Sequence, residues 1–583
     1  MFRSVTQPQA MVVGLLVIHA ALLSYLATRY SPTIDEVGHL PAGLYTWEFG
    51  RFDVFRVNPP LVRTLAALPV RLSDPEYDWS SYREGLTARP EWSLGGDLMR
   101  TNGEVSLRYI TWARWMLIPI SLFGGFICWR WAKELYGAAA GLTALTLWGF
   151  SPTVLGYGAL ITPDLSAASL GVTAAYTYWR WLRTPSTVWT LIAGMTLGLA
   201  ELTKMTWLIL FVLWPVLWLA RVIRRRSNVD GRENEPLDIQ PSTFNQLNKL
   251  AVILLLGLYV LNVGYAFDGT LTRLGDYQFV SRTLSGQEFN TGETEVGANR
   301  FVGTWCESLR VPLPRDYVTG IDLQKREFER GKWSFLRGEW KHGGWWWYYL
   351  YAVLIKEPLG TWCLLGLAMI AAWKVPTRNV HWTDTLAVVL PGLVLFVLVS
   401  SQTGFNKYIR YVLPAFPFAF VWISQGIRLV ELDRQRWSLP VCGVLLWSIA
   451  SSIWIYPHSL SYFNESVGGP SGGHKHLIDA NVDWGQGLYD LKDWLDAHPD
   501  SKPLYVACRA YVPLEVLGLE FDRVPSTPES GWFILSRHDR HTRSGEYSYL
   551  DSLTPVDSIA GCFDVYQISA DDVSRLMRST HTD

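Results

Sequence analysis

The chain has 583 residues, of which 49% are hydrophobic and only 18% are charged, and it contains 30 tryptophans. Soluble domains carry about 25% charged residues, so this composition indicates a membrane protein. The formal net charge of −1 gives none of the basic excess that nucleic-acid binding requires, and no nucleic-acid partner is expected. The six cysteines form no CxxC pair, which argues against a structural zinc site.

Hydrophobic residues cluster in stretches of about 18–22 residues, each long enough to cross about 30 Å of hydrocarbon. About eleven transmembrane helices are predicted, near residues 9–28, 109–128, 138–158, 163–180, 187–203, 205–221, 248–266, 348–373, 383–400, 411–428 and 438–456. The first stretch could be a cleaved signal peptide. It is long for one, and no convincing small-residue cleavage site follows it, so a retained anchor is favoured.

The charges of the connecting loops predict the orientation. Five connections are rich in Lys and Arg, and these lie near residues 129–133, 179–183, 221–226, 374–378 and 428–436. By the positive-inside rule they face the cytoplasm, which gives a multi-pass protein of the cytoplasmic (inner) membrane. The N-terminus is then cytoplasmic and the C-terminus extracytoplasmic.

Two domains are predicted. Residues 1–456 form the membrane module, with outer loops at 29–108 and 267–347 and a polar cytoplasmic linker at 223–247. Residues 457–583 form an extracytoplasmic α/β domain, because a helical pattern at 487–497 precedes short strand-like runs. The strand-like runs lie at 504–508, 532–535 and 563–566.

Ionisable residues concentrate at the predicted outer edges of the spans. The adjacent carboxylates Asp35 and Glu36 follow the first span. The other outer-edge candidates are Arg114, Asp164, Lys204, Lys356 and Arg410. Charges against apolar sequence are expensive unless they pair or serve a function, so we expect one polar cavity at the outer leaflet. A carboxylate there could take a proton from an acceptor hydroxyl, while the cations hold a phosphate.

Each residue also has a purely structural interpretation. Asp164 follows Thr-Pro and could cap a helix. Lys204 could pair with Glu201, three residues before it, and Lys356 could pair with its neighbour Glu357. Lys204, Lys356 and Arg410 could instead extend to lipid headgroups. Their convergence on one side of the membrane favours a shared site.

Short motifs in this chain resemble those of a known enzyme family. They are Asp35-Glu36, Asn58-Pro59-Pro60-Leu61, Ala113-Arg114, Thr162-Pro163-Asp164, Thr203-Lys204, Lys356-Glu357-Pro358-Leu359 and Tyr408-Ile409-Arg410-Tyr411-Val412-Leu413-Pro414. The chain is similar to integral-membrane glycosyltransferases of the GT-C type, in the dolichyl-phosphate-mannose protein mannosyltransferase and aminoarabinose transferase-like superfamily. The resemblance covers residues from about 9 to 456.

The resemblance implies inverting transfer of a sugar from a polyprenyl-phosphate donor to a protein or glycolipid acceptor outside the cytoplasm. It implies that Asp35 is the catalytic base, supported by Glu36, and that Asp164 is the second catalytic acid. Arg114, Lys204, Lys356 and Arg410 are the expected contacts to the donor phosphate. No cofactor is certain, because relatives differ in metal use; a divalent cation would have Glu36 and Asp164 as candidate ligands.

A C-terminal stretch also resembles a bacterial branch of this family. It runs from Tyr462-Phe463-Asn464-Glu465 to Asn481-Val482-Asp483-Trp484-Gly485-Gln486. It is either a lid or linker whose Asp, Asn and Gly residues form turns, or a region that recognises the acceptor.

Two other functions remain alternatives for the whole chain. One is a transporter or flippase for a lipid-linked or anionic substrate. A transport path should have charges near the midplane or on both sides, whereas here they lie on one side. The other is an inactive glycan-binding relative, which the presence of Asp35, Glu36 and Asp164 disfavours.

Overall fold

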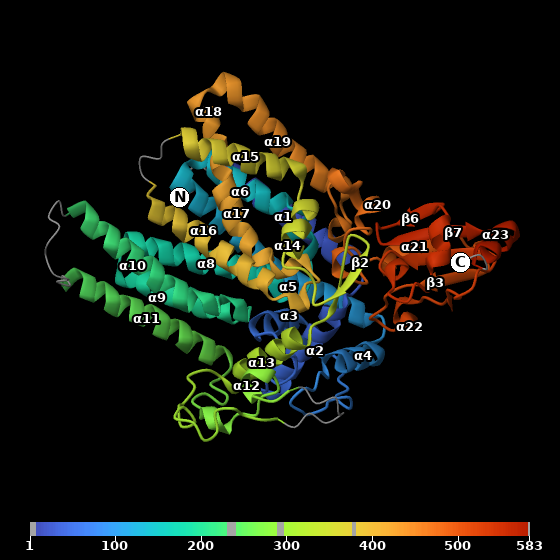
Figure 1. The fold of residues 1–583 in the computed structure, drawn as a ribbon, viewed down its shortest axis with the longest axis horizontal. Helices are drawn as coiled ribbons and strands as arrows, with labels where there is room; N and C mark the ends of the chain where they lie inside the picture. Colours follow the sequence, from blue (N-terminus) through green and yellow to red (C-terminus); the bar gives the residue numbers. More distant parts are fainter. Residues whose placement is uncertain (1–6, 230–240, 289–296, 376–379, 581–583) are drawn as a thin grey trace.

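The computed structural model describes residues 7–229, 241–288, 297–375 and 380–580, and most of its elements are helices (Figure 1). The predicted fold class, a helical membrane protein with a small C-terminal sheet, is confirmed. The described parts of the predicted linker 223–247 are helical. These ends belong to α10 (Ile209–Val229) and α11 (Pro241–Gly264), and residues 230–240 lie outside the described ranges.

Seven described stretches are long and apolar enough to cross a membrane. They are α1 (Gln7–Arg29), α5 (Val105–Tyr136), α10 with the turn before it, α11, α16 (Trp382–Ser401), Leu413–Leu432 and α19 (Arg434–Ile455). Leu413–Leu432 contains α17 (Phe416–Ile423) and α18 (Leu429–Leu432) joined by 3-10 turns. The chain is therefore a multi-pass membrane protein.

Two further candidate spans are helix pairs bent at a proline, each a broken span or a re-entrant loop. α6 (Ala138–Phe150) and α7 (Pro152–Gly158) meet at 55°, and α14 (Tyr348–Lys356) and α15 (Leu359–Lys374) meet at 107°. The residue before a proline avoids the helical conformation, and Ser151 and Glu357 are both extended. Each pair corresponds to one predicted span, so the described residues contain up to nine spans of this kind.

The two remaining predicted spans, 163–180 and 187–203, correspond to α8 (Pro163–Arg183) and α9 (Thr187–Glu201). α8 is long enough to cross but is mostly buried among other helices. α9 has 15 residues, and at about 1.5 Å per residue it is short for a bilayer crossing. A total of eleven spans therefore stays a prediction.

The first predicted outer loop is a layer of helices. It contains α2 (Ile34–Phe49), α3 (Leu61–Arg71) and α4 (Glu91–Asn102). α2 begins after Thr33 with a capping box, in which Glu36 Oε2 accepts from the Thr33 amide at 3.0 Å. α2 packs closely on α3: a Cβ added to Gly43 would lie 2.1 Å from the carbonyl oxygen of Arg63. Asp35 therefore lies in the first turn of a firmly packed helix.

The second outer segment contains α12 (Arg282–Ser285), α13 (Arg315–Arg330) and an antiparallel hairpin of β1 (Trp333–Leu336) and β2 (Glu339–His342). A stretch of 3-10 turns, η3 (Thr403–Phe405), η4 (Ile409–Tyr411) and η5 (Leu413–Ala415), joins α16 to α17. This irregular stretch carries Arg410.

The C-terminal region contains a five-stranded sheet in the order β4-β3-β5-β7-β6. Its strands are β3 (Leu504–Ala507), β4 (Asp522–Arg523), β5 (Gly531–Ser536), β6 (Asp557–Ile559) and β7 (Phe563–Ile568). Its helices are α20 (Gly469–Gly473), α21 (Leu488–Ala497), α22 (Leu514–Leu517) and α23 (Ala570–Thr580). The predicted helix and all three predicted strands are present. The boundary at residue 456 stays a prediction.

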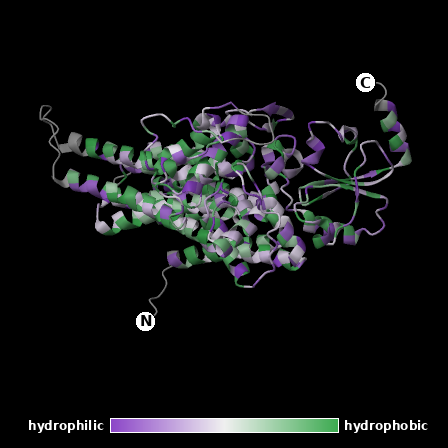
Figure 2. Cartoon of the chain, turned by 90° about the horizontal axis from the view of Figure 1, so that it is seen from below, coloured by the Kyte–Doolittle hydropathy of each residue, from purple (hydrophilic) through white to green (hydrophobic). Residues whose placement is uncertain are grey.

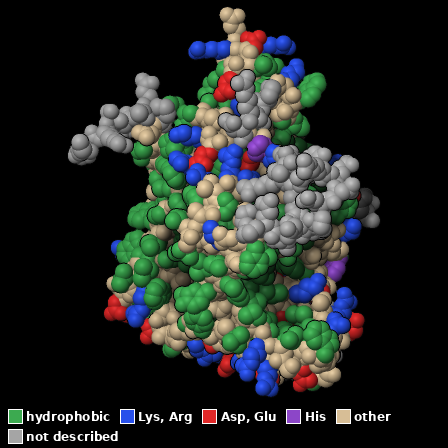
Figure 3. All heavy atoms as spheres, turned by 90° about the vertical axis from the view of Figure 1, so that its left-hand side faces the viewer, with side chains coloured by type: hydrophobic (Ala, Val, Ile, Leu, Met, Phe, Trp, Pro, Cys, Tyr) green, Lys and Arg blue, Asp and Glu red, His purple; other side chains and the backbone are tan. Residues whose placement is uncertain are grey.

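The two ends of the molecule are formed by different elements. Figures 1 and 2 place the C-terminal sheet at one end and the free ends of α10 and α11 at the other, with hydrophobic residues concentrated in the helices between them. Figure 3 shows hydrophobic side chains over the middle of one face, with charged side chains gathered at its lower and upper edges.

Candidate active site

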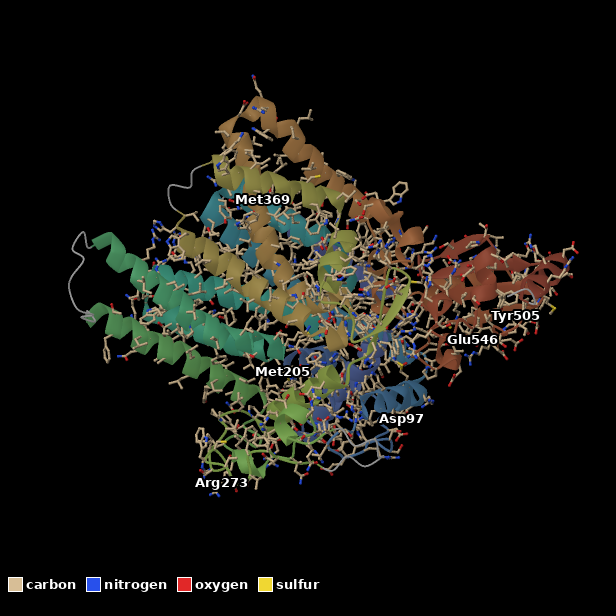
Figure 4. All side chains as sticks on the ribbon, in the orientation of Figure 1. Asp97, Met205, Arg273, Met369, Tyr505 and Glu546 are labelled. Carbon is tan, nitrogen blue, oxygen red and sulfur yellow. The ribbon has the colours of Figure 1, made fainter. Side chains whose placement is uncertain are left out.

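A cavity of about 560 Å³ lies where the helices meet the first and second outer segments. Its charged lining residues are Asp35, Arg89, Asp164, Lys204, Glu327, Lys332 and Arg410. Met205, which directly follows Lys204, lies at this junction and packs with Phe52 and Tyr317 (Figure 4). Four of the seven predicted site residues line the cavity, namely Asp35, Asp164, Lys204 and Arg410.

Arg410 joins the two acids of the cavity. Its Nη1 atom lies 2.8 Å from Asp35 Oδ2 and 3.1 Å from Asp164 Oδ2. The Asp35 side chain is 16% exposed and that of Asp164 only 1%. Asp35 is therefore the carboxylate that a molecule in the cavity can reach.

Asp164 holds a second cation as well. Its Oδ1 atom accepts from Lys204 Nζ at 2.6 Å, so one carboxylate orients both Lys204 and Arg410. Asp164 lies in the first turn of α8, where a negative charge also interacts favourably with the helix dipole. Asp164 can therefore stabilise the start of α8 and also belong to the site.

Three aromatic rings surround the Arg410 guanidinium. Its Cζ atom lies 4.4 Å from the centre of the Trp484 ring, 5.0 Å from Tyr408 and 5.2 Å from Tyr411. Rings at these distances stabilise a buried cation and fix the plane of the guanidinium. Arg410 Nε is buried and has no hydrogen-bond partner among the described residues, so it is an unsatisfied donor beside the cavity.

A second cluster of charged residues on the cavity wall consists of Arg89, Glu327 and Lys332. These residues were not singled out by the sequence analysis. Arg89 Nη1 donates to Glu327 Oε1 at 2.7 Å, and Lys332 Nζ lies 3.4 Å from Glu327 Oε2. Burial lowers the pKa of Lys332, an effect that Glu327 partly offsets. These residues come from a loop and from the end of α13, where charged residues ordinarily face water. Spacing in the sequence contains no signal for this cluster.

Glu36 and Arg114 lie outside the cavity and bind each other. Arg114 donates from Nε to Glu36 Oε1 at 2.7 Å and from Nη2 to Glu36 Oε2 at 2.6 Å. Its remaining donors reach the carbonyls of Ala27, Tyr30 and Ser31. The predicted contact between Arg114 and a donor phosphate does not fit this position, because all its N–H groups already have acceptors.

Lys356 also lies away from the cavity. Its Nζ atom donates to the carbonyls of Leu460 and Asn481, both at 2.7 Å. Glu357 Oε1 accepts from Thr153 at 2.6 Å and from Ser151 at 3.1 Å. Neither the predicted contact of Lys356 with a phosphate nor its alternative pairing with Glu357 fits this arrangement.

The alternative interpretation, in which Lys204 pairs with Glu201, is wrong. Lys204 pairs with Asp164, whereas Glu201 Oε2 accepts from the Tyr317 hydroxyl at 2.8 Å. The tight turn between α9 and α10 places Glu201 and Lys204 in different surroundings.

One histidine beside the site was also missed. His39 lies one turn after Asp35 on α2, is 2% exposed and stacks on Phe55, a cavity-lining residue, at 4.2 Å. Burial and the nearby Arg63 guanidinium lower the pKa of His39 well below its usual range. The imidazole is therefore neutral at physiological pH.

A divalent cation at Glu36 and Asp164 would need both carboxylates turned toward one point. Glu36 is directed to Arg114 and Asp164 to Lys204 and Arg410. Within the described ranges, no group of three or more His, Cys, Asp or Glu side chains is arranged to hold a metal. The residues therefore do not fit the expected metal site in this arrangement.

Residues 109–229 match the model of the family described as dolichyl-phosphate-mannose-protein mannosyltransferase. The matched segment runs from α5 to α10 and contains Arg114, Asp164 and Lys204. The resemblance inferred from short motifs is confirmed for this segment. No curated protein matches the chain at a significant level.

The solved structures that are similar to this chain include the following three. Cupriavidus metallidurans ArnT bound to undecaprenyl phosphate is 11% identical, with a TM-score of 0.46 over 95% of this chain and 97% of that one. The Saccharomyces cerevisiae protein O-mannosyltransferase Pmt1–Pmt2 complex bound to the sugar donor is 11% identical, with a TM-score of 0.46 over 78% and 89%. The Archaeoglobus fulgidus oligosaccharyltransferase tethered with an acceptor peptide is 10% identical, with a TM-score of 0.40 over 76% and 53%.

Proposed function

We propose that this chain is an inverting glycosyltransferase of the GT-C type, which moves a sugar from a polyprenyl phosphate to an acceptor hydroxyl at the outer face of the cytoplasmic membrane. The observation that carries the proposal is the Arg410 guanidinium, which lies between Asp35 and Asp164 on the wall of one cavity. The family match over residues 109–229 supports the same class of reaction.

Asp35 is proposed as the general base. In a single displacement, the acceptor oxygen forms a bond to the anomeric carbon while the bond from that carbon to the phosphate oxygen breaks. Asp35 takes the proton of the acceptor hydroxyl, and the electron pair of the broken bond leaves with the polyprenyl phosphate. Asp35 suits this role because it is the more accessible of the two carboxylates bound to Arg410.

Arg410 and Lys204 are proposed to neutralise the phosphate. Arg410 lines the cavity and has an unsatisfied Nε donor, and a guanidinium binds phosphate oxygens with forked geometry. A phosphate that draws Arg410 toward itself weakens the ion pair with Asp35, which leaves Asp35 able to accept a proton. Asp164 is proposed to hold the two cations in place, because it contacts both and is almost wholly buried.

The cavity offers a route for a lipid-linked donor. Leu398 and Val399 of α16 are part of its wall, and Leu398 lies among exposed apolar neighbours that include Leu393 and Val397. A polyprenyl chain can remain in the hydrocarbon beside α16 while its phosphate enters the polar part of the cavity. Undecaprenyl phosphate, the ligand of the ArnT structure, belongs to this class of lipid.

The other expected residues are proposed to act on structure rather than on substrate. The Glu36–Arg114 pair fixes the start of α2 and so the position of Asp35. The extracytoplasmic location of the acceptor follows from the loop charges and is part of the proposal. Protein and glycolipid acceptors both carry suitable hydroxyl groups.

A transporter is less favoured than a transferase. Asp35, Asp164, Lys204 and Arg410 gather in a single cavity, whereas a transport path needs polar groups along its length. An inactive relative would not need an accessible carboxylate held against a phosphate-binding cation.

The direct test incubates the purified protein with radiolabelled polyprenyl-phosphate sugars and acceptor membranes. The expected result is labelled acceptor with inverted anomeric configuration and release of polyprenyl phosphate. Retained configuration would exclude the single displacement. Labelling from a nucleotide sugar without lipid would exclude the proposed donor.

A further inference from the structure

The segment Asp479–Gln486 reaches from the C-terminal region to the cavity. It begins with the 3-10 turn η9 (Asp479–Asn481) and ends just before α21. Trp484 is a lining residue of the cavity, and the other described lining residues all precede residue 412. The cavity is thus completed by a segment from beyond the last predicted span.

Asn481 binds the backbone on both sides of Tyr408. Its Oδ1 atom accepts from the Ile409 amide at 3.0 Å, and its Nδ2 atom donates to the Lys407 carbonyl at 2.8 Å. These are the contacts that a neighbouring β-strand would make. Asn481 is fully buried, so the loss of either contact would leave a backbone group without water.

The backbone around Arg410, to which Asn481 binds, needs support from outside the stretch. Arg410 belongs to η4, between two further 3-10 turns, and 3-10 turns have poor hydrogen-bond geometry. Tyr348 adds a hydrogen bond from its hydroxyl to the Lys407 carbonyl at 2.6 Å. The Asn481 amide contacts Ile409, the residue directly before Arg410, and so fixes the backbone from which the guanidinium projects.

Trp484 fixes the guanidinium itself. Its ring centre lies 4.4 Å from Arg410 Cζ, and the tryptophan is 2% exposed. The ring packs edge-on against Tyr157, whose hydroxyl donates to the Ala480 carbonyl at 2.9 Å. Tyr157 therefore helps to hold the Trp484 ring in place, while one face of the ring contacts Arg410.

The end of the segment binds the chain that leads to Asp35. Ser31 Oγ donates to the Gly485 carbonyl at 2.5 Å, and the Ser31 amide donates to the Gln486 carbonyl at 3.0 Å. Ser31 Oγ also accepts from the Leu488 amide at 2.9 Å. Ser31 is fully buried and lies four residues before Asp35, in the non-helical stretch that leads into α2.

We infer that Asp479–Gln486 aligns the two partners of the Asp35–Arg410 pair, with Asn481 and Trp484 as positioning residues for Arg410. The segment holds Ser31 at one end and Ile409 at the other, and so sets how the base and the phosphate-binding cation approach each other. The C-terminal region is thereby part of the active site. The catalytic consequence rests on the proposed function, whereas the positioning itself can be measured without activity.

The first test uses amide hydrogen exchange on the full-length protein, comparing Asn481→Ala with Asn464→Ala. Asn464 is equally buried and also donates to backbone carbonyls, those of Leu354 and Glu357, but it does not contact the Arg410 stretch. Exchange in peptides covering 405–411 should rise at least tenfold in Asn481→Ala and stay unchanged in Asn464→Ala. Unchanged exchange in Asn481→Ala would overturn the inference.

The second test measures kcat and the donor KM. Asn481→Ala and Trp484→Leu should lower kcat 10- to 100-fold, with a loss of thermal stability no larger than that of Asn464→Ala. Trp484→Phe retains an aromatic face and should recover most of the lost kcat. Equal kcat losses in Asn481→Ala and Asn464→Ala, or no recovery in Trp484→Phe, would contradict positioning. An inactive wild type would refute the proposed function and leave the exchange result to decide the inference.

Discussion

Arg114 and Glu36 form a buried two-pronged ion pair, with hydrogen bonds of 2.7 and 2.6 Å between them. Glu36 also accepts from the amides of Thr33 and Ile161. The pair therefore links α2, α5 and the turn before α8. Two adjacent carboxylates thus have different surroundings, since Asp35 lines the cavity and Glu36 does not.

Substitution of Arg114 should reduce stability more than it affects binding. Arg114→Met leaves the Glu36 carboxylate buried without its cation, which is expected to cost about 3–5 kcal/mol. The double variant Glu36→Gln/Arg114→Met removes both charges and should recover part of this loss. Thermal unfolding in detergent measures both effects. A donor KM that rises while the midpoint stays constant would instead support phosphate binding by Arg114.

Substitution of Asp35 should remove catalysis. Asp35→Asn keeps the shape of the side chain but cannot accept the proton, so kcat should fall about 10²–10⁴-fold with a similar donor KM. Asp53→Asn is a matched control, because its side chain is 19% exposed, it also pairs with an arginine, and it lies in the same outer segment. Equal activity of Asp35→Asn and wild type in the radiolabel assay would rule out Asp35 as the base.

Arg410 should not be replaceable by lysine. Lysine keeps the positive charge but has neither a planar fork nor the stacking that Trp484 and the two tyrosines provide. We expect Arg410→Lys to raise the donor KM and to lower kcat about 10–100-fold, a loss of roughly 1.4–2.7 kcal/mol. Steady-state kinetics over a range of donor concentrations separates the two effects. Wild-type kinetics for Arg410→Lys would show that charge alone is sufficient.

The contact between α2 and α3 offers a test of how Asp35 is placed. A Cβ at Gly43 would overlap the Arg63 carbonyl oxygen, so Gly43→Ala must push the two helices apart at a cost of about 1–3 kcal/mol. Gly14→Ala in α1 meets nothing within 4 Å and should be neutral or slightly stabilising. Both the unfolding midpoint and kcat should fall in Gly43→Ala alone. Identical behaviour of the two variants would contradict this close packing.

The C-terminal region should lose stability in acid. Burial lowers the pKa of His474 to about 2, the pKa of His538 to about 3 and the pKa of His541 to about 4. An unfolded histidine has a pKa near 6.5, so below that pH the unfolded state binds more protons and stability falls. Each histidine contributes about 1.4 kcal/mol per pH unit. Burial raises the pKa of Asp539 to about 6, which offsets about one histidine between pH 6 and 4.

Limited proteolysis at pH 7.5 and pH 5, with cleavage sites mapped by mass spectrometry, checks this dependence. Cleavage between residues 474 and 568 should increase at pH 5. His538→Gln removes one titrating group, so the cleavage rate of this variant should differ less between the two pH values. A cleavage rate independent of pH would refute the linkage.

The sequence predicted the fold where the physical signal is local. Apolar length predicted the helical stretches, and short strand-like runs predicted strands at 504–508, 532–535 and 563–566, close to the observed β3, β5 and β7. The breaks before Pro152 and Pro358 were missed because hydropathy continues through them, although residues before proline favour extended structure.

The site was predicted in part. Asp35, Asp164, Lys204 and Arg410 were found because charge in apolar sequence is conspicuous. Arg114 and Lys356 carry the same signal, yet their partners are Glu36 and backbone carbonyls, which only tertiary structure reveals. Lys332 reaches the cavity from a polar region in which a charged side chain has no special meaning. The stretch that contains Trp484 was noted for its resemblance, but its contact with Arg410 was not predicted.

The hydrogen bonds from Ser31 to Gly485 and Gln486 have a consequence for synthesis. Asp35, Asp164, Lys204 and Arg410 all precede Asn481 in the chain and are translated before it. If Asp479–Gln486 aligns them, a nascent chain has every helix of the membrane module but no working site. Catalysis would then begin only after the C-terminal region has been made and folded, so a partly made chain would not consume its lipid-linked donor.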